Sequence, residues 1–229
     1  MESIDNSTPH LASVYDSKIN STIPYYECFH KEVLKFLDIT IGNPRIWLDT
    51  GCGTGSLIEK AIDNFANTLF ILADPSEGML REAKLKLHKF LKEKIKYIPS
   101  ATQYIELDES ERPDIITAIQ AHHYLSREER EKATIKCYDL LRDGGIYITF
   151  ENIRPFTVVG TNNGKEYWKQ FQISCGKTSL EAEKHMDRFG VEYFPITVEE
   201  HLSLLRKSGF KVVELFWYSY MQAGFYCIK

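Results

Sequence analysis

The residues best suited to chemistry in this 229-residue chain are an aspartate and three glycines at alternate positions, Asp49, Gly51, Gly53 and Gly55. They end a short apolar run at 45–49 and precede a helix-like stretch that begins at residue 56. Glycine tolerates a positive φ and lets a ligand approach main-chain atoms closely. The spacing therefore predicts a strand-to-helix turn that binds a ligand against its backbone.

A second carboxylate, Asp74, follows another apolar run, at 68–73. In an open α/β sheet, ligands bind beyond the carboxyl ends of the strands, near the point where the strand order reverses. A carboxylate one strand–helix–strand unit after a glycine loop is placed to accept hydrogen bonds from both hydroxyls of a ribose. The pattern favours a nucleoside ligand, and the alternative is an ordinary glycine turn with Asp74 as a surface carboxylate.

The glycine spacing distinguishes two kinds of nucleoside site. Dinucleotide-binding loops have the form GxGxxG, and the following helix points its N-terminus at a pyrophosphate. Here the form is GxGxG, with Asp49 two residues before the first glycine. A carboxylate there would repel a pyrophosphate and attract a cation, such as the amino acid end of a sulfonium nucleoside.

The elements that must position these residues alternate between strands and helices. Strands are predicted at about 45–49, 68–73, 95–98, 114–119 and 146–150, with helices at about 24–37, 56–66, 77–91 and 127–141. This alternation is typical of parallel βαβ units in an open, doubly wound α/β sheet. Two final runs, 212–217 and 225–228, are too close for a parallel crossover and predict an antiparallel hairpin. Ser76, Ser126 and Thr197 are predicted helix N-caps.

Two stretches fall outside this alternation. Residues 1 to about 20 lack periodicity and are expected to be loosely ordered unless a ligand fixes them, and residues 153–195 predict a helical insertion after the fifth strand. Tyr167, Trp168 and Phe171 in that insertion have helical spacing. This spacing fits two alternatives: a helix whose aromatic face caps a substrate, or a helix that packs on the sheet.

Composition limits the function classes. The net charge of -4 argues against a positively charged surface dedicated to binding nucleic acid or an anionic membrane. The five cysteines contain no CxxC pair, so we expect reduced thiols and no metal site. The N-terminus does not resemble a signal peptide, and no apolar run reaches membrane-spanning length. We expect a cytoplasmic protein.

The Asp-x-Gly-x-Gly-x-Gly form, with Asp74 after the second strand, resembles motif I of class I S-adenosylmethionine-dependent methyltransferases. The resemblance covers nearly the whole chain. It implies one domain over 1–229, with an N-terminal helical segment at about 1–40, a helical cap at about 153–195, and a Rossmann-like sheet of seven strands whose last strand is antiparallel. It also implies S-adenosyl-L-methionine as cofactor, S-adenosyl-L-homocysteine as product, and these cofactor-binding residues: Tyr15, Tyr26, Asp49, Gly51, Cys52, Gly53, Gly55, Asp74, Pro75, Met79, Ala101, Thr102, Gln120 and Ala121.

The second half of the chain is similar to bacterial enzymes that carboxymethylate the wobble uridine of tRNA, and to small uncharacterised methyltransferases. In the tRNA enzymes a Pro-x-Tyr segment contacts the cofactor, and Pro24-Tyr25-Tyr26 matches it. Those enzymes recognise an extra cofactor carboxylate with an arginine, but Lys184-His185-Met186 stands at the matching place and the nearest arginine is Arg188. We therefore expect plain S-adenosylmethionine.

His122 and His123 follow the fourth strand, at the edge of the expected methyl site. A histidine there is a candidate general base or substrate-orienting group, and the alternative is that His122 packs against the cofactor and His123 is structural. The acidic balance favours a small-molecule acceptor, and the resemblance to the tRNA enzymes fits a monomer or a homodimer. The alternatives are a tRNA-modifying methyltransferase, a non-catalytic S-adenosylmethionine-binding protein and an NAD-dependent oxidoreductase.

Overall fold

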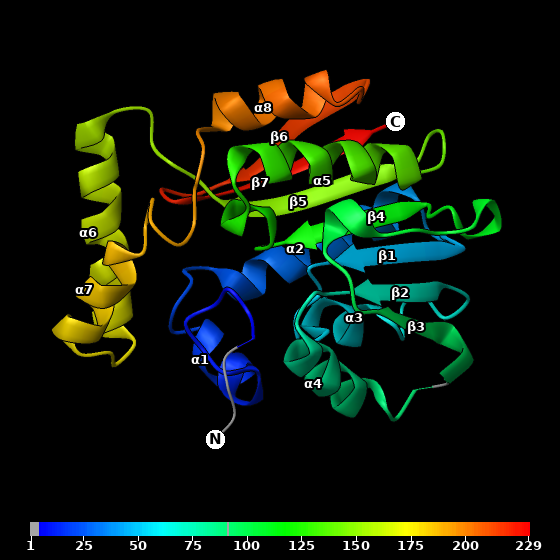
Figure 1. Cartoon of the computed structure of the whole chain (residues 1–229), viewed down its shortest axis with the longest axis horizontal. Coiled ribbons are helices and arrows are strands. Elements are labelled where there is room, and N and C mark those ends of the chain that lie inside the picture. The colour runs from blue at the N-terminus through cyan, green and yellow to red at the C-terminus, as the bar shows by residue number, and fades with distance from the viewer. Residues whose placement is uncertain (1–4, 91) are drawn as a thin grey trace.

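The computed structural model describes residues 5–90 and 92–229, and its centre is a seven-stranded sheet of order β3-β2-β1-β4-β5-β7-β6 (Figure 1). All neighbouring pairs are parallel except those that involve β7, which runs antiparallel to both β5 and β6. The predicted mixed sheet and its terminal hairpin are thus confirmed. The strands are β1 Ile46–Thr50, β2 Leu69–Ala73, β3 Ile95–Ile98, β4 Ile115–Ile119, β5 Ile146–Asn152, β6 Val212–Tyr218 and β7 Gln222–Ile228.

The helices lie on both faces of this sheet and beyond one end of it (Figure 1). They are α1 Tyr15–Ile19, α2 Tyr26–Thr40, α3 Ser56–Ala61, α4 Glu77–Leu87, α5 Arg127–Leu140, α6 Val158–Ser174, α7 Ser179–Asp187 and α8 Val198–Lys207. The helices α6 and α7, which follow β5, stand away from the sheet at the left of the view.

Successive residues of the inner strands point to opposite faces, which builds two apolar cores. Trp47 of β1 packs into one core with residues of α2, α3 and α4, whereas its neighbour Leu48 packs into the other with residues of α5 and α8. All five residues of β1 are buried because β2 and β4 flank it and helices cover both its faces. The end of β1, where the glycine loop begins, is therefore fixed from all sides.

The predicted N-caps are confirmed. Ser76, Ser126 and Thr197 each accept a hydrogen bond from the backbone N–H three residues later, and Ser126 and Thr197 complete capping boxes with Glu129 and Glu200. These caps fix where α4, α5 and α8 begin, and α4 begins directly after the end of β2.

Several predicted boundaries were wrong. The stretch 1–20 was expected to be loosely ordered, yet α1 forms within it and buries Tyr15 and Ile19 in the core; residues 1–4 lie outside the described residues. The helix expected at Pro24 begins at Tyr26, after Tyr25 in the left-handed region at φ 61°. The helices α3 and α4 end four or five residues before their predicted ends, at Ala61 and Leu87.

In the insertion after β5, the aromatic residues have different environments. Trp168 is fully buried and donates its indole N–H to the Thr22 carbonyl at 2.6 Å. Tyr167 is exposed and stacks on Tyr220. Trp168 therefore packs in the protein interior, and its indole N–H is hydrogen-bonded to the chain that precedes α2.

Candidate cofactor-binding site

The glycine loop after β1 has a left-handed backbone at each of its three glycines, with φ of 63°, 54° and 74° at Gly51, Gly53 and Gly55. A Cβ at Gly51 would lie 2.4 Å from Cβ of Ala121, so the loop can pass the end of β4 only because this residue is glycine. A Cβ at Gly53 would meet no atom within 4 Å among the described residues, so that side of the loop is open.

Asp74 joins the glycine loop to the start of α4. Its Oδ2 accepts the N–H of Gly53 and its Oδ1 accepts the N–H of Ser76, both at 2.9 Å. The side chain is buried, and burial raises the pKa of Asp74 while the two backbone hydrogen bonds oppose that rise. A carboxylate has about four acceptor positions, so Asp74 still has lone pairs for the hydroxyls of a ligand.

Asp49 lies at the end of β1 and is 2% exposed. Its Oδ1 accepts the hydroxyl of Thr117 at 2.6 Å, and that hydroxyl oxygen accepts the indole N–H of Trp47 at 2.9 Å. Burial raises the pKa of Asp49 to about 7, the Thr117 hydrogen bond opposes the rise, and the negative charge of Asp74 adds to it. No salt bridge to Asp49 is present within residues 5–90 and 92–229. A bound cation would therefore stabilise its charged form.

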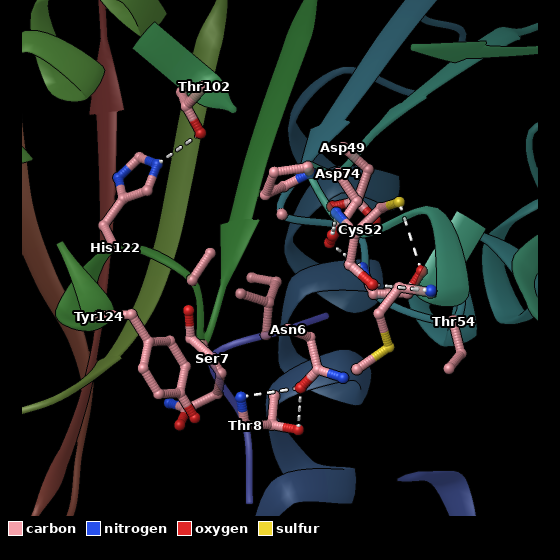
Figure 2. Close-up of a pocket in the computed structure, with 18 of the residues that line it drawn as sticks. Asn6, Ser7, Thr8, Asp49, Cys52, Thr54, Asp74, Thr102, His122 and Tyr124 are labelled. Atoms are coloured by element: carbon pink, nitrogen blue, oxygen red, sulfur yellow. Dashed lines mark hydrogen bonds between the residues drawn. The ribbon is translucent and has the colours of Figure 1, made fainter. Parts of the chain in front are cut away.

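A cavity of about 160 Å³ lies at the carboxyl ends of β1, β2 and β4, where these groups meet (Figure 2). Gly55 lies outside it, where an added Cβ would come within 3.2–3.3 Å of the side chains of Leu72, Leu87 and Ala83. The other residues that the methyltransferase resemblance implies all line it: Tyr15, Tyr26, Asp49, Gly51, Cys52, Gly53, Asp74, Pro75, Met79, Ala101, Thr102, Gln120 and Ala121.

The N-terminal segment Asp5–Thr8, which sequence reasoning missed, forms one wall of this cavity. Asp5 accepts the Ser76 hydroxyl at 2.7 Å and the Gly78 N–H at 2.9 Å, and these two hydrogen bonds lower the pKa of Asp5. Asn6, Ser7 and Thr8 lie opposite the glycine loop in Figure 2. The segment has no apolar periodicity, so no pattern in the sequence could have placed it there.

The two histidines after β4 have different positions. His122 lines the cavity, where its Nε2 is 3.1 Å from the Thr102 hydroxyl and its Nδ1 is 3.3 Å from the Tyr147 hydroxyl. Burial lowers the pKa of His122 to about 4, so this ring is neutral at pH 7. His123 lies outside the cavity lining and is 2.7 Å from Glu151 through its Nδ1.

Glu151 of β5, also missed from the sequence, holds this turn in place. It accepts the backbone N–H groups of His122 and His123 at 3.0 Å each, the His123 ring nitrogen, and the Thr149 hydroxyl at 2.8 Å. Burial raises the pKa of Glu151, but the His123 hydrogen bond and the electrostatic effect of the neighbouring imidazoles outweigh burial and lower this pKa to about 2. Glu151 is therefore a buried carboxylate that positions the turn bearing His122.

Gln120 occupies a strained position between β4 and this turn. It has a φ of 56°, which is uncommon for a residue other than glycine, and it lines the cavity. Its buried Oε1 has no hydrogen-bond partner among the described residues. Backbone strain of this kind persists where the surrounding structure enforces it, typically at ligand sites.

Within residues 5–90 and 92–229, no group of three or more His, Cys, Asp or Glu side chains is arranged to hold a metal ion. No helix of the described residues is long and apolar enough to cross a membrane.

Comparisons with known proteins agree with this geometry. Residues 48–147, which contain the glycine loop, Asp74 and the His122 turn, match the family described as "Methyltransferase domain". Over 211 residues the chain is 25% identical to a carboxy-S-adenosyl-L-methionine synthase of Nautilia profundicola, which covers 90% of this chain and 86% of that protein. The synthase of Methylococcus capsulatus is 23% identical over 225 residues, covering 96% of this chain and 91% of that protein.

Solved structures show the same fold. The plantazolicin methyltransferase BpumL superposes with a TM-score of 0.71 at 14% identity, covering 95% of this chain and 90% of that one. Magnesium protoporphyrin IX methyltransferase from Synechocystis gives a TM-score of 0.64 at 15% identity, covering 91% and 85%. Both of those structures contain S-adenosylhomocysteine.

Proposed function

We propose that this chain, an S-adenosylmethionine-dependent enzyme with a class I methyltransferase domain, transfers a methyl group to a small-molecule acceptor. The observation that carries the proposal is the pairing of Asp49 and Asp74 on one cavity that is open at Gly53. Two buried carboxylates repel a polyphosphate and suit a cationic nucleoside. The structures that share this fold and contain S-adenosylhomocysteine support the same cofactor.

Each of the three residues has a separate role in this proposal. Asp49 pairs with the cationic amino acid end of the cofactor, because it is buried and lacks a basic partner in the described chain. Asp74 accepts the ribose hydroxyls, since Gly53 and Ser76 already hold it in place. The open side of Gly53 admits the ligand against the backbone.

The chemistry relies mainly on alignment. S-adenosylmethionine supplies an electrophilic methyl group, and the protein has to hold a nucleophile in line with it. His122 is neutral and lines the cavity, but both its ring nitrogens face hydroxyl groups of the protein. We assign it a positioning role, in which it orders Thr102 and the turn after β4. The involvement of His123 in chemistry stays a prediction.

A second candidate function comes from the relatives. Carboxy-S-adenosyl-L-methionine synthases match nine-tenths of the chain, at about one residue in four. In this alternative the chain would carboxylate the methyl group of S-adenosylmethionine instead of transferring it: the methyl carbon would lose a proton and form a bond to carbon dioxide, supplied as such or by a carboxylic acid that releases it. The product would be a sulfonium nucleoside heavier by one carbon dioxide, whereas methyl transfer would yield S-adenosylhomocysteine.

The test is a labelled-methyl experiment read by mass spectrometry. The protein is incubated with S-adenosylmethionine carrying a labelled methyl group and a metabolite extract, and the nucleoside products are separated. We expect S-adenosylhomocysteine and one labelled small molecule. Label in bulk tRNA would support the tRNA-modifying alternative, and binding without turnover would support a non-catalytic binding protein.

Calorimetry tests the cofactor directly. We expect saturable binding of S-adenosylmethionine and S-adenosylhomocysteine and none of NAD. A folded sample that binds neither sulfur nucleoside would refute the proposed function, and saturable NAD binding would favour the oxidoreductase. A cytoplasmic location and a monomeric or homodimeric state stay predictions.

A further inference from the structure

A second cavity, of about 420 Å³, lies between the N-terminal part of the chain and α7. We call it the cationic cavity; the residues of its lining that matter here are Lys18, Lys177, Lys184, His185 and Arg188, with Glu181 as the acidic member. Its volume falls in the range of about 300–1,000 Å³ that is usual for small-molecule sites.

The three lysines of the cationic cavity lack an acidic partner. No salt bridge to Lys18, Lys177 or Lys184 occurs in the described part of the chain, whereas Arg188 pairs through its Nε with Glu192; the net charge of the whole chain is -4. Glu181 is engaged in capping α7, where it accepts from the N–H and hydroxyl of Thr178 at 2.8 and 2.7 Å. The cavity therefore concentrates positive charge.

The ammonium group of Lys177 is partly removed from water, which disfavours its charged form. Its ammonium donates to the Thr22 hydroxyl at 2.8 Å and to the Gln172 side-chain oxygen at 3.3 Å. Burial lowers the pKa of Lys177 to about 8. Both partners are neutral oxygens, so an anion beside Lys177 would recover the charge pairing that the protein does not supply.

His185 provides a second, independent sign of a missing partner. It is 7% exposed, it lines the cationic cavity, and neither of its ring nitrogens has a hydrogen-bond partner among the described residues. The Nη1 atom of Arg188 is likewise buried and unpartnered within those residues. Buried polar groups in proteins are nearly always hydrogen-bonded, and an imidazole N–H and a guanidinium N–H both require an acceptor.

Arg188 also connects the cationic cavity with the cavity at the carboxyl ends of β1, β2 and β4, which we call the cofactor cavity. Its Nη2 donates to the backbone carbonyl of Ser7 at 2.8 Å, and Ser7 lines the cofactor cavity. The next residues along the chain, Pro9 and His10, line the cationic cavity. One short stretch of the N-terminal chain is thus the shared wall of both cavities, and a ligand in one is close to a ligand in the other.

We propose that the cationic cavity binds an oxyanion, a carboxylate or a phosphate, carried by the methyl acceptor. The inference rests on the proposed function and specifies its substrate class: an acidic small molecule. Lys177 supplies the charge, and His185 and Arg188 each supply an unpartnered N–H group. The acceptor extends from this anchor past Ser7 toward the cofactor cavity.

The test measures the binding of two simple probes, inorganic phosphate and acetate, by calorimetry on protein saturated with S-adenosylhomocysteine. We expect one of them to bind with a Kd on the order of 1 mM or tighter. Lys177→Gln should weaken that binding about tenfold or more, since it removes a charge-assisted contact. Lys31→Gln, on the exposed side of α2, is the matched control and should leave the affinity unchanged.

His185→Leu separates a binding role from a structural one. It should weaken probe binding and leave the thermal stability of the probe-free protein equal or higher, because an unpartnered buried polar group is replaced by an apolar one. Loss of stability without a change in probe affinity would mean that His185 is structural and would overturn the inference.

The result also separates this inference from the proposed function. If S-adenosylhomocysteine binds and neither phosphate nor acetate does, the anion site is refuted and the methyltransferase proposal stands. An equal loss of affinity in Lys31→Gln and Lys177→Gln would likewise refute the site, because nonspecific screening would explain it. Preference for phosphate or for acetate identifies which acid the acceptor carries.

Discussion

The buried carboxylate of Asp49 predicts that cofactor affinity depends on pH in a narrow range. Burial raises the pKa of Asp49 to about 7 in the ligand-free protein. If the cationic nucleoside binds the ionised form, then binding below that pKa requires loss of a proton, and affinity falls as the pH falls. Above the pKa the carboxylate is already charged, so affinity is constant there.

The size of the effect follows from the ionised fraction. With a pKa of about 7, roughly nine-tenths of Asp49 is ionised at pH 8 and roughly one-tenth at pH 6, so the affinity for S-adenosylmethionine should fall about tenfold between them. That factor corresponds to about 1.4 kcal/mol. The histidines that line the cavity do not change their charge between pH 6 and pH 8, because burial lowers the pKa of His122 to about 4 and that of His30 to about 3.

Calorimetry at pH 6, 7 and 8 measures this dependence directly. Asp49→Asn removes the titrating group and keeps a similar shape, so it should bind more weakly at pH 8 and show no slope. Asp38→Asn, on the exposed surface of α2, is the control and should retain the slope of the wild type. An unchanged affinity from pH 6 to pH 8 in the wild type, or the same slope in Asp49→Asn, would refute the reasoning.

Three further predictions concern the loop, the ribose position and the turn after β4. Asp74→Ala should weaken S-adenosylhomocysteine binding about tenfold or more by calorimetry, because it removes the acceptor for the ribose hydroxyls and releases the Gly53 N–H; an unchanged Kd would show that the ribose lies elsewhere. Gly51→Ala should lower the free energy of unfolding by about 1–3 kcal/mol more than Gly42→Ala in urea titrations. Both glycines have a φ of 63°, but only the first added methyl would meet another atom, Cβ of Ala121, so equal losses would contradict the steric argument. Glu151→Gln should cost about 3–5 kcal/mol at pH 7, because its buried donors lose a carboxylate acceptor. Since its folded pKa of about 2 lies below the ordinary 4.5, the wild type should lose this stabilisation as the pH falls through that interval, and an acid-unfolding curve identical to that of Glu151→Gln would contradict the assignment.

The fold was largely predictable because its signals are local. Apolar runs predicted each central strand within a residue or two, and Ser76, Ser126 and Thr197 marked the helix starts correctly. The parallel order followed from the alternation of strands and helices, and the antiparallel β7 from the short connection before it. Helix ends were less accurate: Ile62 and Phe65 continue the apolar pattern beyond α3 and are buried in the core, but they lie in turns.

The site was predictable where strand ends carry the chemistry, and not elsewhere. Asp49 and Asp74 follow directly from the position of the glycine loop, and the structure brings both to one cavity. Asp5 could not be found this way, because its partners Ser76 and Gly78 are about seventy residues away in the sequence. Glu151 is the next-to-last residue of β5, a strand with no unusual sequence pattern, and only the fold brings the N–H groups of the turn after β4 to it.

The N-terminal segment has a kinetic consequence. Asp5 completes the hydrogen bonding of the α4 N-terminus, and the residues after it wall a cavity of about 160 Å³, smaller than the roughly 300–1,000 Å³ usual for a small-molecule site. A nucleoside bound in this cavity would therefore lie against the segment, which is held to α4 through Asp5. We expect Asp5→Ala, which removes these hydrogen bonds, to loosen this wall and shorten the residence time of a bound cofactor.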